Sequence, residues 1–357
     1  MPLVRSAQMV NRVLFGDCRE TLRELAVQGL KAQCCVTSPP YYGLRDYGHP
    51  GQIGLEKTPA EYVAAMVEVF GLVRDVLADD GVLWLNLGDS YCSTAPGTRN
   101  AEHAKGSTAH AGQWANMRPA TPPGLKPKDL IGIPWRVAFA LQADGWYLRQ
   151  DIIWHKPNPM PESVRDRCTK AHEYLFILTK SERYYWDAEA MQEPSTGLPP
   201  GNVSVQKHQA AYEAGDEKHR TKAGLGVYAE RQRSKRDTFK REASKRAEAI
   251  PGQSVGTHRE DRDESACDVG MRNRRSVWTV PTRAYSAAHF AVFPPALIEP
   301  CILAGSRTGD IVLDPFFGSG TTGQVAQALG RQWIGCELNP EYAPLQEQRT
   351  AQSALAL

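Results

Sequence analysis

Short apolar runs alternate with amphipathic segments from the N-terminal end of the chain onward. A run such as Gly81 to Leu87 is short and predicts a strand, whereas apolar side chains at helical spacing between Pro59 and about Leu77 predict a helix with one buried side. The same pattern predicts strands over Arg12 to Phe15 and Cys34 to Val36, with a short helix between them that carries Leu22, Leu25 and Leu30. This order of strand and helix is typical of a parallel α/β sheet.

The alternation returns in the second half of the chain. The expected elements there are a helix over Pro134 to Ala143, strands around Trp146 to Trp154 and Tyr174 to Leu178, a helix over Pro294 to Ala304, a strand over Ile311 to Leu313, a helix that ends near Leu329, and a strand over Trp333 to Cys336. Together the two halves predict a doubly wound, Rossmann-like α/β fold, in which helices cover both faces of one sheet.

Two segments interrupt this pattern. Residues 93–129 are rich in Gly, Ala, Thr, Pro and His and have almost no large aliphatic side chains, which indicates a flexible inserted loop. Residues 194–273 are strongly polar. The chain therefore divides into the segments 1–92, 93–129, 130–193, 194–273 and 274–357, and the first, third and last of these are expected to build the sheet.

Charge changes this picture only locally. The 357 residues include 42 Lys and Arg against 40 Asp and Glu, so the net charge of +2 gives no sign of a polyanionic partner. Within residues 194–273, however, one short stretch is strongly basic. Its members are Arg231, Arg233, Lys235, Arg236, Lys240, Arg241, Lys245 and Arg246. We call this stretch the basic run; it fits contact with a nucleic-acid backbone, and it also fits an ordinary solvated surface.

Length and composition limit the class of protein. At roughly 150 residues per domain, the chain suggests about two domains or one domain with large insertions. Met1 to Phe15 has no sustained apolar segment, and no later stretch approaches the ~18 apolar residues of a membrane span, so we expect a cytoplasmic protein without a membrane partner. Eight cysteines without a Cys-x-x-Cys pair or a Cys/His cluster indicate reduced thiols and no metal site.

The first candidate site is the turn after the predicted strand Ile311 to Leu313. It reads Asp314-Pro315-Phe316-Phe317-Gly318-Ser319-Gly320-Thr321-Thr322 and opens a helix. At this position of a doubly wound sheet, glycines let the backbone approach a nucleotide-like ligand, and the N–H groups of the helix face it. Glu337 ends the next strand, where a carboxylate can accept hydrogen bonds from ribose hydroxyls. The turn lacks the patterns of dinucleotide and phosphate loops, which disfavours a phosphate-bearing ligand.

With these residues the sequence resembles the amino-methyltransferases of DNA. Asp-Pro-Phe-x-Gly-Ser-Gly-Thr is the adenosylmethionine motif of that family, and Gly335-Cys336-Glu337-Leu338 is similar to its ribose-binding strand end. The resemblance implies a methyltransferase fold and S-adenosyl-L-methionine as cofactor. The residues that it assigns to the cofactor are Asp314, Pro315, Phe316, Gly318, Gly320, Thr321 and Glu337, with Asp17 and Cys18 near the adenine end and Phe293 in the lead-in to a helix.

The second candidate site is Thr37-Ser38-Pro39-Pro40-Tyr41, directly after a predicted strand. Methylation of an exocyclic amine requires the nitrogen lone pair to leave the plane of the ring and point at the donor methyl. Ser38 Oγ and the Pro39 carbonyl can hold the amine hydrogens in that geometry without a covalent intermediate. Pro39 and Pro40 fix the backbone, and Tyr41 offers a face on which an extruded base can stack. We expect Ser38, Pro39, Pro40 and Tyr41 to form a catalytic loop.

The target base is predicted from the resemblance rather than from the chemistry, which is the same for both amines. Thr-Ser-Pro-Pro-Tyr resembles the motif of enzymes that make N4-methylcytosine, whereas adenine-N6 enzymes usually have Asp or Asn in place of Ser38. Cytosine-N4 is therefore favoured, and adenine-N6 is the alternative. A cytosine-C5 enzyme needs a Pro-Cys nucleophile in a loop, but Pro300-Cys301 falls in a predicted helix, where Cys301 is expected to pack in the core. More distant alternatives are methylation of RNA or of a protein glutamine, and a non-catalytic DNA-binding protein on the same fold.

The order of the motifs resembles the beta class, in which the motifs are circularly permuted. In that class the segment between them recognises the target, which here is residues 194–273 with its basic run. The stretch Trp154 to Ser163, followed by His172-Glu173-Tyr174, resembles the Ser-Pro-Pro-Tyr branch near the DNA strand. Lys156, Arg165 and Arg167 are therefore candidate phosphate contacts, or members of a solvated loop. The resemblance implies double-stranded DNA as substrate, with a cognate restriction endonuclease and a homodimer as further candidate partners.

Overall fold

The computed structural model describes residues 10–44, 46–92, 121–194, 271–282 and 293–352. The chain divides into two compact units, Met1–Met191 with Arg275–Leu357, and Gln192–Arg274. The expected inserted loop at 93–129 is described only from residue 121 onward, and the basic run lies outside the described residues. The division of the sequence into five segments therefore stays a prediction.

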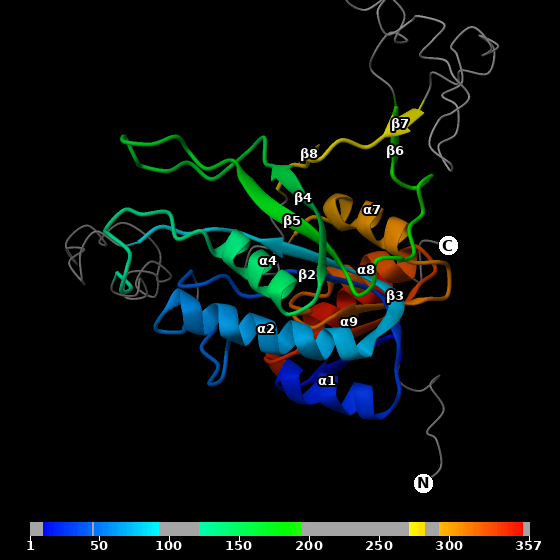
Figure 1. The fold of residues 1–357 in the computed structure, drawn as a ribbon. Helices are drawn as coiled ribbons and strands as arrows, with labels where there is room; N and C mark the ends of the chain where they lie inside the picture. Colours follow the sequence, from blue (N-terminus) through cyan, green and yellow to red (C-terminus); the bar gives the residue numbers. More distant parts are fainter. Residues whose placement is uncertain (1–9, 45, 93–120, 195–270, 283–292, 353–357) are drawn as a thin grey trace, which may run out of the picture. The chain divides into compact units, whose positions relative to one another are not determined.

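One eight-stranded sheet runs through the larger unit (Figure 1). Its strands, in order across the sheet, are β1 (Arg12–Phe15), β10 (Gln332–Glu337), β9 (Ile311–Asp314), β2 (Ala32–Thr37), β3 (Leu77–Leu87), β5 (His172–Thr179), β4 (Tyr147–His155) and β8 (Val277–Thr279). Neighbouring strands are parallel except at β5, which is antiparallel to both β3 and β4. The predicted Rossmann-like α/β fold is confirmed, with one strand of the sheet reversed.

The connection before β5 explains its reversal. Residues 156–171 join β4 to β5 without a helix, so the chain returns directly beside β4 in the opposite direction. By contrast, β2 and β3 are joined through a helix and are parallel. The parallel arrangement expected from the sequence is interrupted at β5, because a hairpin places β4 and β5 antiparallel.

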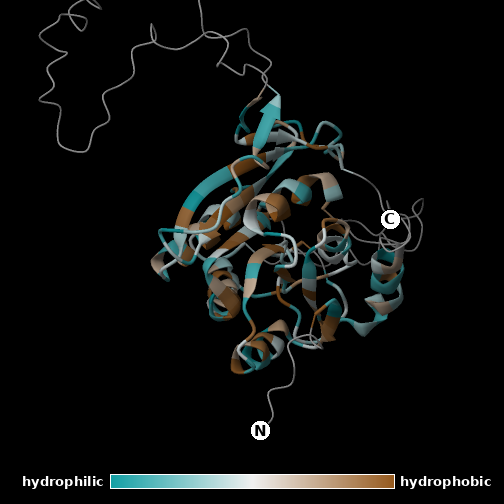
Figure 2. Ribbon diagram, turned by 90° about the vertical axis from the view of Figure 1, so that its right-hand side faces the viewer, coloured by the Kyte–Doolittle hydropathy of each residue, from teal (hydrophilic) through white to brown (hydrophobic). Residues whose placement is uncertain are grey.

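Helices cover both faces of the sheet (Figure 1). On one face lie α1 (Cys18–Val27), α2 (Pro59–Val76) and α4 (Ile133–Ala143), and on the other lie α7 (Pro295–Gly305) and α8 (Thr321–Ala328). In β3, Leu83 and Leu85 pack into the first of two hydrophobic cores, and Val82 and Trp84 pack into the second. Strands buried on both faces have continuous apolar runs, which is why the sequence predicted them. The helices, with one covered side, carry both hydrophobic and hydrophilic residues (Figure 2).

Capping residues set the starts of two helices. Thr58 caps α2, and its hydroxyl accepts a hydrogen bond from Glu61 N at 3.2 Å. Asp17 caps α1 through Arg19 N at 2.8 Å. In α7, Cys301 is fully buried, which confirms that this cysteine packs in the core.

The direction of winding changes between β9 and β2. From β9 the chain passes through α8 to β10 on one side, and from β2 it passes through α2 to β3 on the other. In doubly wound sheets, ligands bind outside the carboxyl ends of the strands at such a point. Asp314 ends β9 and Thr37 ends β2, so both predicted motifs begin there.

The sequence pattern missed several short elements. These are β8, the antiparallel pair β6 (Gln192–Pro194) and β7 (Met271–Asn273) of the smaller unit, the 3-10 turn η8 (Pro340–Tyr342) and the helix α9 (Ala343–Gln352). Each of the missed strands spans three residues, which is too short to show a period. Over the described ranges, no helix is both long enough and apolar enough to span a bilayer.

Candidate active site

The two predicted motifs meet through a buried hydrogen bond. The hydroxyl of Thr37 donates to Oδ1 of Asp314 at 2.7 Å, although 277 positions separate the two residues in the sequence. Just before them, Cys35 of β2 pairs with Leu313 of β9. The loop after β2 and the turn after β9 therefore belong to one site.

Asp314 is the centre of the hydrogen bonds in this turn. Besides Thr37, its carboxylate accepts bonds from Thr322 Oγ1 at 2.6 Å and from Phe316 N at 3.0 Å. Burial raises the pKa of Asp314 to about 6, and the hydroxyl and amide donors oppose that rise. Both carboxylate oxygens are thus engaged within the protein, where they hold the turn to β2 and to the start of α8. A direct contact of Asp314 with the cofactor stays a prediction.

Two glycines shape the turn. Gly318 and Gly320 have φ angles of 53° and 87°, in the left-handed region that side chains disfavour. Gly320 is the N-cap of α8 and makes no side-chain cap, so the first N–H groups of this helix are available to a ligand. The backbone of the turn can therefore approach a bound molecule closely.

Phe317 holds the turn against the sheet. Its ring stacks on Trp333, with ring centroids 5.0 Å apart, and its N–H donates to the Cys336 carbonyl at 2.9 Å. The ring occupies space that two glycines leave open. A Cβ at Gly323 would lie 2.7 Å from Phe317 Cζ, and a Cβ at Gly335 would overlap the same ring.

Glu337 lies beside the turn at the end of β10. Its Oε2 accepts the Gly318 N–H at 2.8 Å, and its Oε1 accepts the Asn339 N–H at 2.9 Å. Burial raises the pKa of Glu337 to about 7. Each carboxylate oxygen has more than one acceptor position, so both can still bind ribose hydroxyls.

Asp17 and Cys18 are close to this strand end. Gly16 N donates to the Glu337 carbonyl at 2.9 Å, and the two candidate residues follow directly. The Arg19 side chain holds Asp17 at 2.5 Å and lowers its pKa, while Cys18 is buried. Of the remaining cofactor candidates, Pro315 is buried, and Phe316 and Phe293 are half-buried against the two cores.

Side chains of α9, the helix that the sequence analysis missed, donate hydrogen bonds to the turn that follows Asp314. Gln346 Nε2 donates to the Gly318 carbonyl at 2.7 Å, and Arg349 donates to the hydroxyls of Ser319, at 3.1 Å, and Thr321. Gln346 and Arg349 are both buried and lie three positions apart, on one side of the helix. The hydroxyl of Thr321, a predicted cofactor contact, is thus already bound within the protein.

Ser38 opens the predicted catalytic loop at the carboxyl end of β2. Its Oγ lies 3.3 Å from the hydroxyl of Tyr41. The Pro40 carbonyl accepts a hydrogen bond from Tyr62 at 2.8 Å, which fixes the loop. The Pro39 carbonyl has no hydrogen-bond partner in the part of the chain that the structure describes, so its lone pairs are available to a ligand there.

Side chains from β3 and β5 set the position of Tyr41. Its hydroxyl donates to Glu173 Oε2 at 2.7 Å and lies 3.0 Å from Asn86 Oδ1. Burial, together with the charge of Glu173, raises the pKa of Tyr41 well above its usual value, so the phenol stays protonated. The ring packs on Gly88, where an added Cβ would lie 2.5 Å from Tyr41 Cε2. Stacking of a base on this ring remains a prediction.

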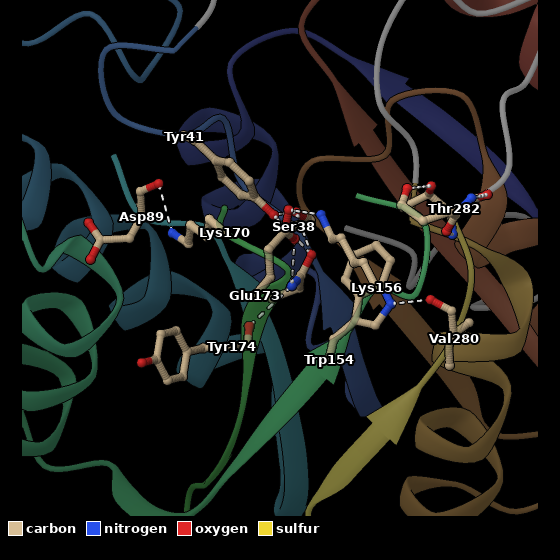
Figure 3. A network of polar contacts seen from close by, with 12 residues as sticks. Ser38, Tyr41, Asp89, Trp154, Lys156, Lys170, Glu173, Tyr174, Val280 and Thr282 are labelled. Carbon is tan, nitrogen blue, oxygen red and sulfur yellow. Dashed lines mark hydrogen bonds and ion pairs between the residues drawn. The ribbon is translucent and has the colours of Figure 1, made fainter. Parts of the chain in front are cut away.

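Glu173 is the centre of a polar network that the sequence analysis did not assign (Figure 3). Its Oε2 accepts from Asn86 Nδ2 at 3.2 Å as well as from Tyr41, and its Oε1 pairs with Lys156. The ammonium of Lys156 also lies 4.3 Å from the ring centroid of Trp154. Only 15% of the Glu173 side chain and 18% of the Lys156 side chain are exposed. The structure thus connects Lys156, a candidate phosphate contact, through Glu173 to Tyr41 of the predicted catalytic loop.

The other two candidate phosphate contacts lie between β4 and β5. Arg165 is exposed, whereas Arg167 pairs with Glu162 at 2.5 Å and lies 3.9 Å from the ring centroid of Tyr91. Contact of Arg165 and Arg167 with DNA stays a prediction. Across the described residues, no group of three or more His, Cys, Asp and Glu side chains could hold a metal ion.

Comparison with known proteins assigns the chain to a family. The family described as DNA methylase matches residues 32–348 of the chain. The chain is 44% identical over 341 residues to the Type II methyltransferase M.SmaI of Serratia marcescens, which covers 95% of this chain and 90% of that protein.

Two solved structures are similar in fold. One is the PvuII DNA methyltransferase described as cytosine-N4-specific, with a TM-score of 0.53, 17% identity, and coverage of 95% of this chain and 85% of that one. The other is a Thermus thermophilus protein solved in complex with S-adenosyl-L-methionine, with a TM-score of 0.51, 19% identity, and 97% of each chain covered. Together with the family match over most of its length, the 44% identity shows that the chain belongs to the N6/N4 DNA methylase family.

Proposed function

We propose that this DNA methylase transfers the methyl group of S-adenosyl-L-methionine to the N4 amino group of a cytosine that is flipped out of duplex DNA. The observation that carries the proposal is the buried bond between Thr37 and Asp314, which joins the two motifs. It sets the acceptor pair of Ser38 Oγ and the Pro39 carbonyl beside a turn suited to a nucleoside-like cofactor.

The choice of cytosine rests on Ser38. Thr-Ser-Pro-Pro-Tyr resembles the cytosine-N4 motif, and the order of the two motifs supports the permuted beta class. The PvuII enzyme, which has a similar fold, is described as cytosine-N4-specific. Adenine-N6 is the alternative, because the same acceptor pair serves either amine.

The catalytic loop acts by holding the amine. Ser38 Oγ and the Pro39 carbonyl accept its two hydrogens, which turns the nitrogen lone pair out of the plane of the base. The bond from Tyr62 to the Pro40 carbonyl keeps the loop in this conformation before substrate binds. The Tyr41 ring, supported from one side by Gly88, offers its other side to the base.

The residues around the turn fit S-adenosyl-L-methionine, which supplies an electrophilic methyl group on its sulfonium sulfur. Glu337 accepts hydrogen bonds from the ribose, Asp17 and Cys18 lie toward the adenine, and the first N–H groups of α8 face the amino-acid end. A protein of similar fold was solved with this molecule, which supports the assignment.

The affinity for S-adenosyl-L-methionine is expected to fall as the pH drops below about 7, the value to which burial raises the pKa of Glu337. Ionised Glu337 accepts hydrogen bonds through both oxygens, whereas the protonated acid has one acceptor fewer. Binding therefore favours the carboxylate, and affinity is lost as Glu337 becomes protonated, by up to about tenfold per pH unit. Isothermal titration calorimetry between about pH 5.5 and pH 8.5 measures this dependence.

A Glu337→Gln variant provides the control for this pH effect. Glutamine is neutral at every pH used, so the variant is expected to bind more weakly and to lack the loss of affinity below about pH 7. A wild-type affinity as independent of pH as that of Glu337→Gln would contradict the role of Glu337 at the ribose.

Replacing Gly335 with alanine is expected to weaken cofactor binding about tenfold or more, equivalent to about 1.4 kcal/mol. The added Cβ overlaps the Phe317 ring, so the turn must move away from the sheet. Gly71→Ala in α2 is the matched control, since a Cβ at Gly71 meets no atom within 4 Å. It is expected to bind the cofactor normally and to raise the free energy of unfolding by about 0.5–1 kcal/mol. Equal affinities in the two variants, measured by calorimetry, would rule out this role of Phe317.

Recognition of DNA is assigned to residues 194–273 and their basic run. The Type II methyltransferase M.SmaI is similar along nearly the whole chain, which supports a role in restriction and modification beside a cognate endonuclease. A homodimer is expected from the resemblance alone, and no surface is assigned to it.

Identification of the modified nucleoside tests the choice of base. Duplex DNA is methylated with the purified protein, digested to nucleosides and analysed by mass spectrometry. N4-methylcytosine is the expected product. N6-methyladenine as the product would confirm an amino-methyltransferase but make adenine, not cytosine, its target base. 5-Methylcytosine would contradict the chemistry proposed for Ser38 and Pro39.

A further inference from the structure

Glu173 ends a continuous line of hydroxyl groups that begins at Ser38 (Figure 3). Ser38 Oγ lies 3.3 Å from Tyr41 Oη, and Tyr41 Oη lies 2.7 Å from Glu173 Oε2. Ser38 and Tyr41 come from the loop after β2, and Glu173 comes from the start of β5. Asn86 of β3 lies beside them. The line leads from the expected position of the substrate amine to a carboxylate.

The hydrogen bond between Tyr41 and Glu173 has one direction. A carboxylate can only accept, so Tyr41 donates its proton to Glu173. Tyr41 Oη then has lone pairs with which to accept the hydroxyl proton of Ser38 at 3.3 Å. The oxygen Oδ1 of Asn86, at 3.2 Å, is a second acceptor for the same proton. Asn86 cannot replace the carboxylate as acceptor of a transferred proton, and its amide is oriented by donation to the Tyr174 carbonyl at 3.1 Å.

Positively charged side chains lie around Glu173. Lys156, just beyond β4, pairs with Oε1, which leaves Oε2 to Tyr41. Lys170 and His172 also lie close enough for their charges to interact with Glu173, although burial lowers the pKa of both. Lys156 is therefore the principal positive charge that faces this carboxylate.

Methyl transfer to an amine leaves one proton too many on the nitrogen. The lone pair of an exocyclic amine is delocalised into the ring, so the methylated cation is strongly acidic and loses its proton close to the transition state. A base within reach of that proton accelerates the reaction. The Ser38 hydroxyl is not itself a base, but it can accept one proton while it donates another.

We propose that Glu173 receives the proton released by the substrate amine, through a relay in which Ser38 and Tyr41 each accept one proton and donate another. The nitrogen forms a bond to the methyl carbon, and the carbon–sulfur bond breaks with its electron pair left on sulfur. The N–H bond breaks, its proton passes to Ser38 Oγ, the Ser38 proton passes to Tyr41, and the Tyr41 proton passes to Glu173 Oε2. One positive charge on sulfur and one negative charge on Glu173 disappear together. Because Glu173 acts through Ser38 and Tyr41, it is a positioning residue, and the inference rests on the proposed function.

The pH dependence of single-turnover methyl transfer tests this relay. Wild type, Glu173→Gln and Tyr41→Phe are loaded with S-adenosyl-L-methionine and mixed with duplex DNA between about pH 6.5 and pH 9. Both variants are expected to be slower than wild type by about 10²-fold near neutral pH, with rates that rise by up to about tenfold per pH unit, because hydroxide must remove the proton. The wild-type rate is expected to vary little. The double variant is expected to be no slower than either single variant, since one interruption stops the relay.

Two further variants complete the test. Glu173→Asp keeps a carboxylate and is expected to keep part of the rate and the flat pH profile. Glu182→Gln removes an exposed carboxylate just beyond the other end of β5 and is expected to behave as wild type. The proposal is overturned if Tyr41→Phe or Glu173→Gln shows the wild-type pH profile. If Glu173→Gln does not fold, Tyr41→Phe alone decides. Failure of wild type to methylate DNA would contradict the proposed function instead.

Discussion

A Ser38→Ala variant is expected to transfer methyl groups about 10²–10³-fold more slowly than wild type, with unchanged affinity for S-adenosyl-L-methionine. Alanine removes the side-chain acceptor for an amine hydrogen and also the first hydroxyl in the line to Tyr41. It leaves the bond between Thr37 and Asp314 in place, so the cofactor turn is undisturbed. Single-turnover rates with cofactor already bound separate the two effects.

Ser90→Ala is the matched control for this change. Ser90 lies just beyond β3, and its hydroxyl donates to the Tyr42 carbonyl at 3.3 Å rather than to the catalytic loop. It is expected to react at the wild-type rate. Equal losses in the two variants, or loss of cofactor affinity in Ser38→Ala, would mean that Ser38 acts through the fold and not on the amine.

An Asp314→Ala variant is expected to lose cofactor binding and to unfold with a free energy lower by about 2–4 kcal/mol. The change removes the carboxylate that accepts hydrogen bonds from the Thr37 and Thr322 hydroxyls and the Phe316 amide, and it leaves Thr322 only the longer bond to the Val36 carbonyl at 3.5 Å. Burial of the charged carboxylate offsets part of this loss, because its removal also ends that cost. Urea denaturation followed by circular dichroism gives the free energy, and calorimetry gives the affinity.

Two further variants show whether the loss comes from the missing hydrogen-bond acceptor of Asp314. Asp314→Asn removes the charge and keeps an acceptor oxygen, and Asp75→Ala is the control. The asparagine keeps one acceptor oxygen for Thr37, so it is expected to retain more stability than Asp314→Ala. Asparagine does not titrate. In wild type, the raised pKa of Asp314 makes its contribution to the free energy of unfolding largest below about pH 4 and smaller as the pH rises to about 6, and the variant lacks this pH dependence. Asp75→Ala removes an exposed aspartate from the last turn of α2 and is expected to be nearly neutral. Wild-type stability and affinity in Asp314→Ala would contradict the role of Asp314.

Where side chains are buried on a regular period, the sequence predicted the fold well. The strand β1 was predicted with its observed bounds, and α2 and α4 were predicted to within a residue at each end. The reversal of β5 was missed because strand direction depends on the connection, and the lack of a helix pattern in residues 156–171, with Pro157, Pro159 and Pro161, was not used to predict a hairpin. The helix α9 was missed because Gln346 and Arg349, two of its buried side chains, are polar.

The sequence predicted those parts of the candidate site whose residues are consecutive in the chain. Thr37 to Tyr41 and the turn that starts at Asp314 stood out in the sequence, and the structure brings them together. Glu173 lay in a stretch that resembled the family but was given no role, because its partners come from three other places in the chain. The roles of Gly88 and Gly335 were also missed. Each leaves room for a ring, that of Tyr41 or that of Phe317, and the sequence does not show which residues pack against a glycine.

Transfer of tritium from the methyl group of S-adenosyl-L-methionine to duplex DNA tests most directly whether the two joined motifs form an amino-methyltransferase site. The purified protein is incubated with the labelled cofactor and equal masses of duplex DNA, RNA and an unrelated protein. Label is expected in the DNA alone, and Ser38→Ala is expected to abolish nearly all of it. Label in RNA or protein but not in DNA would contradict the proposal, as would bound cofactor with no transfer to any of the three.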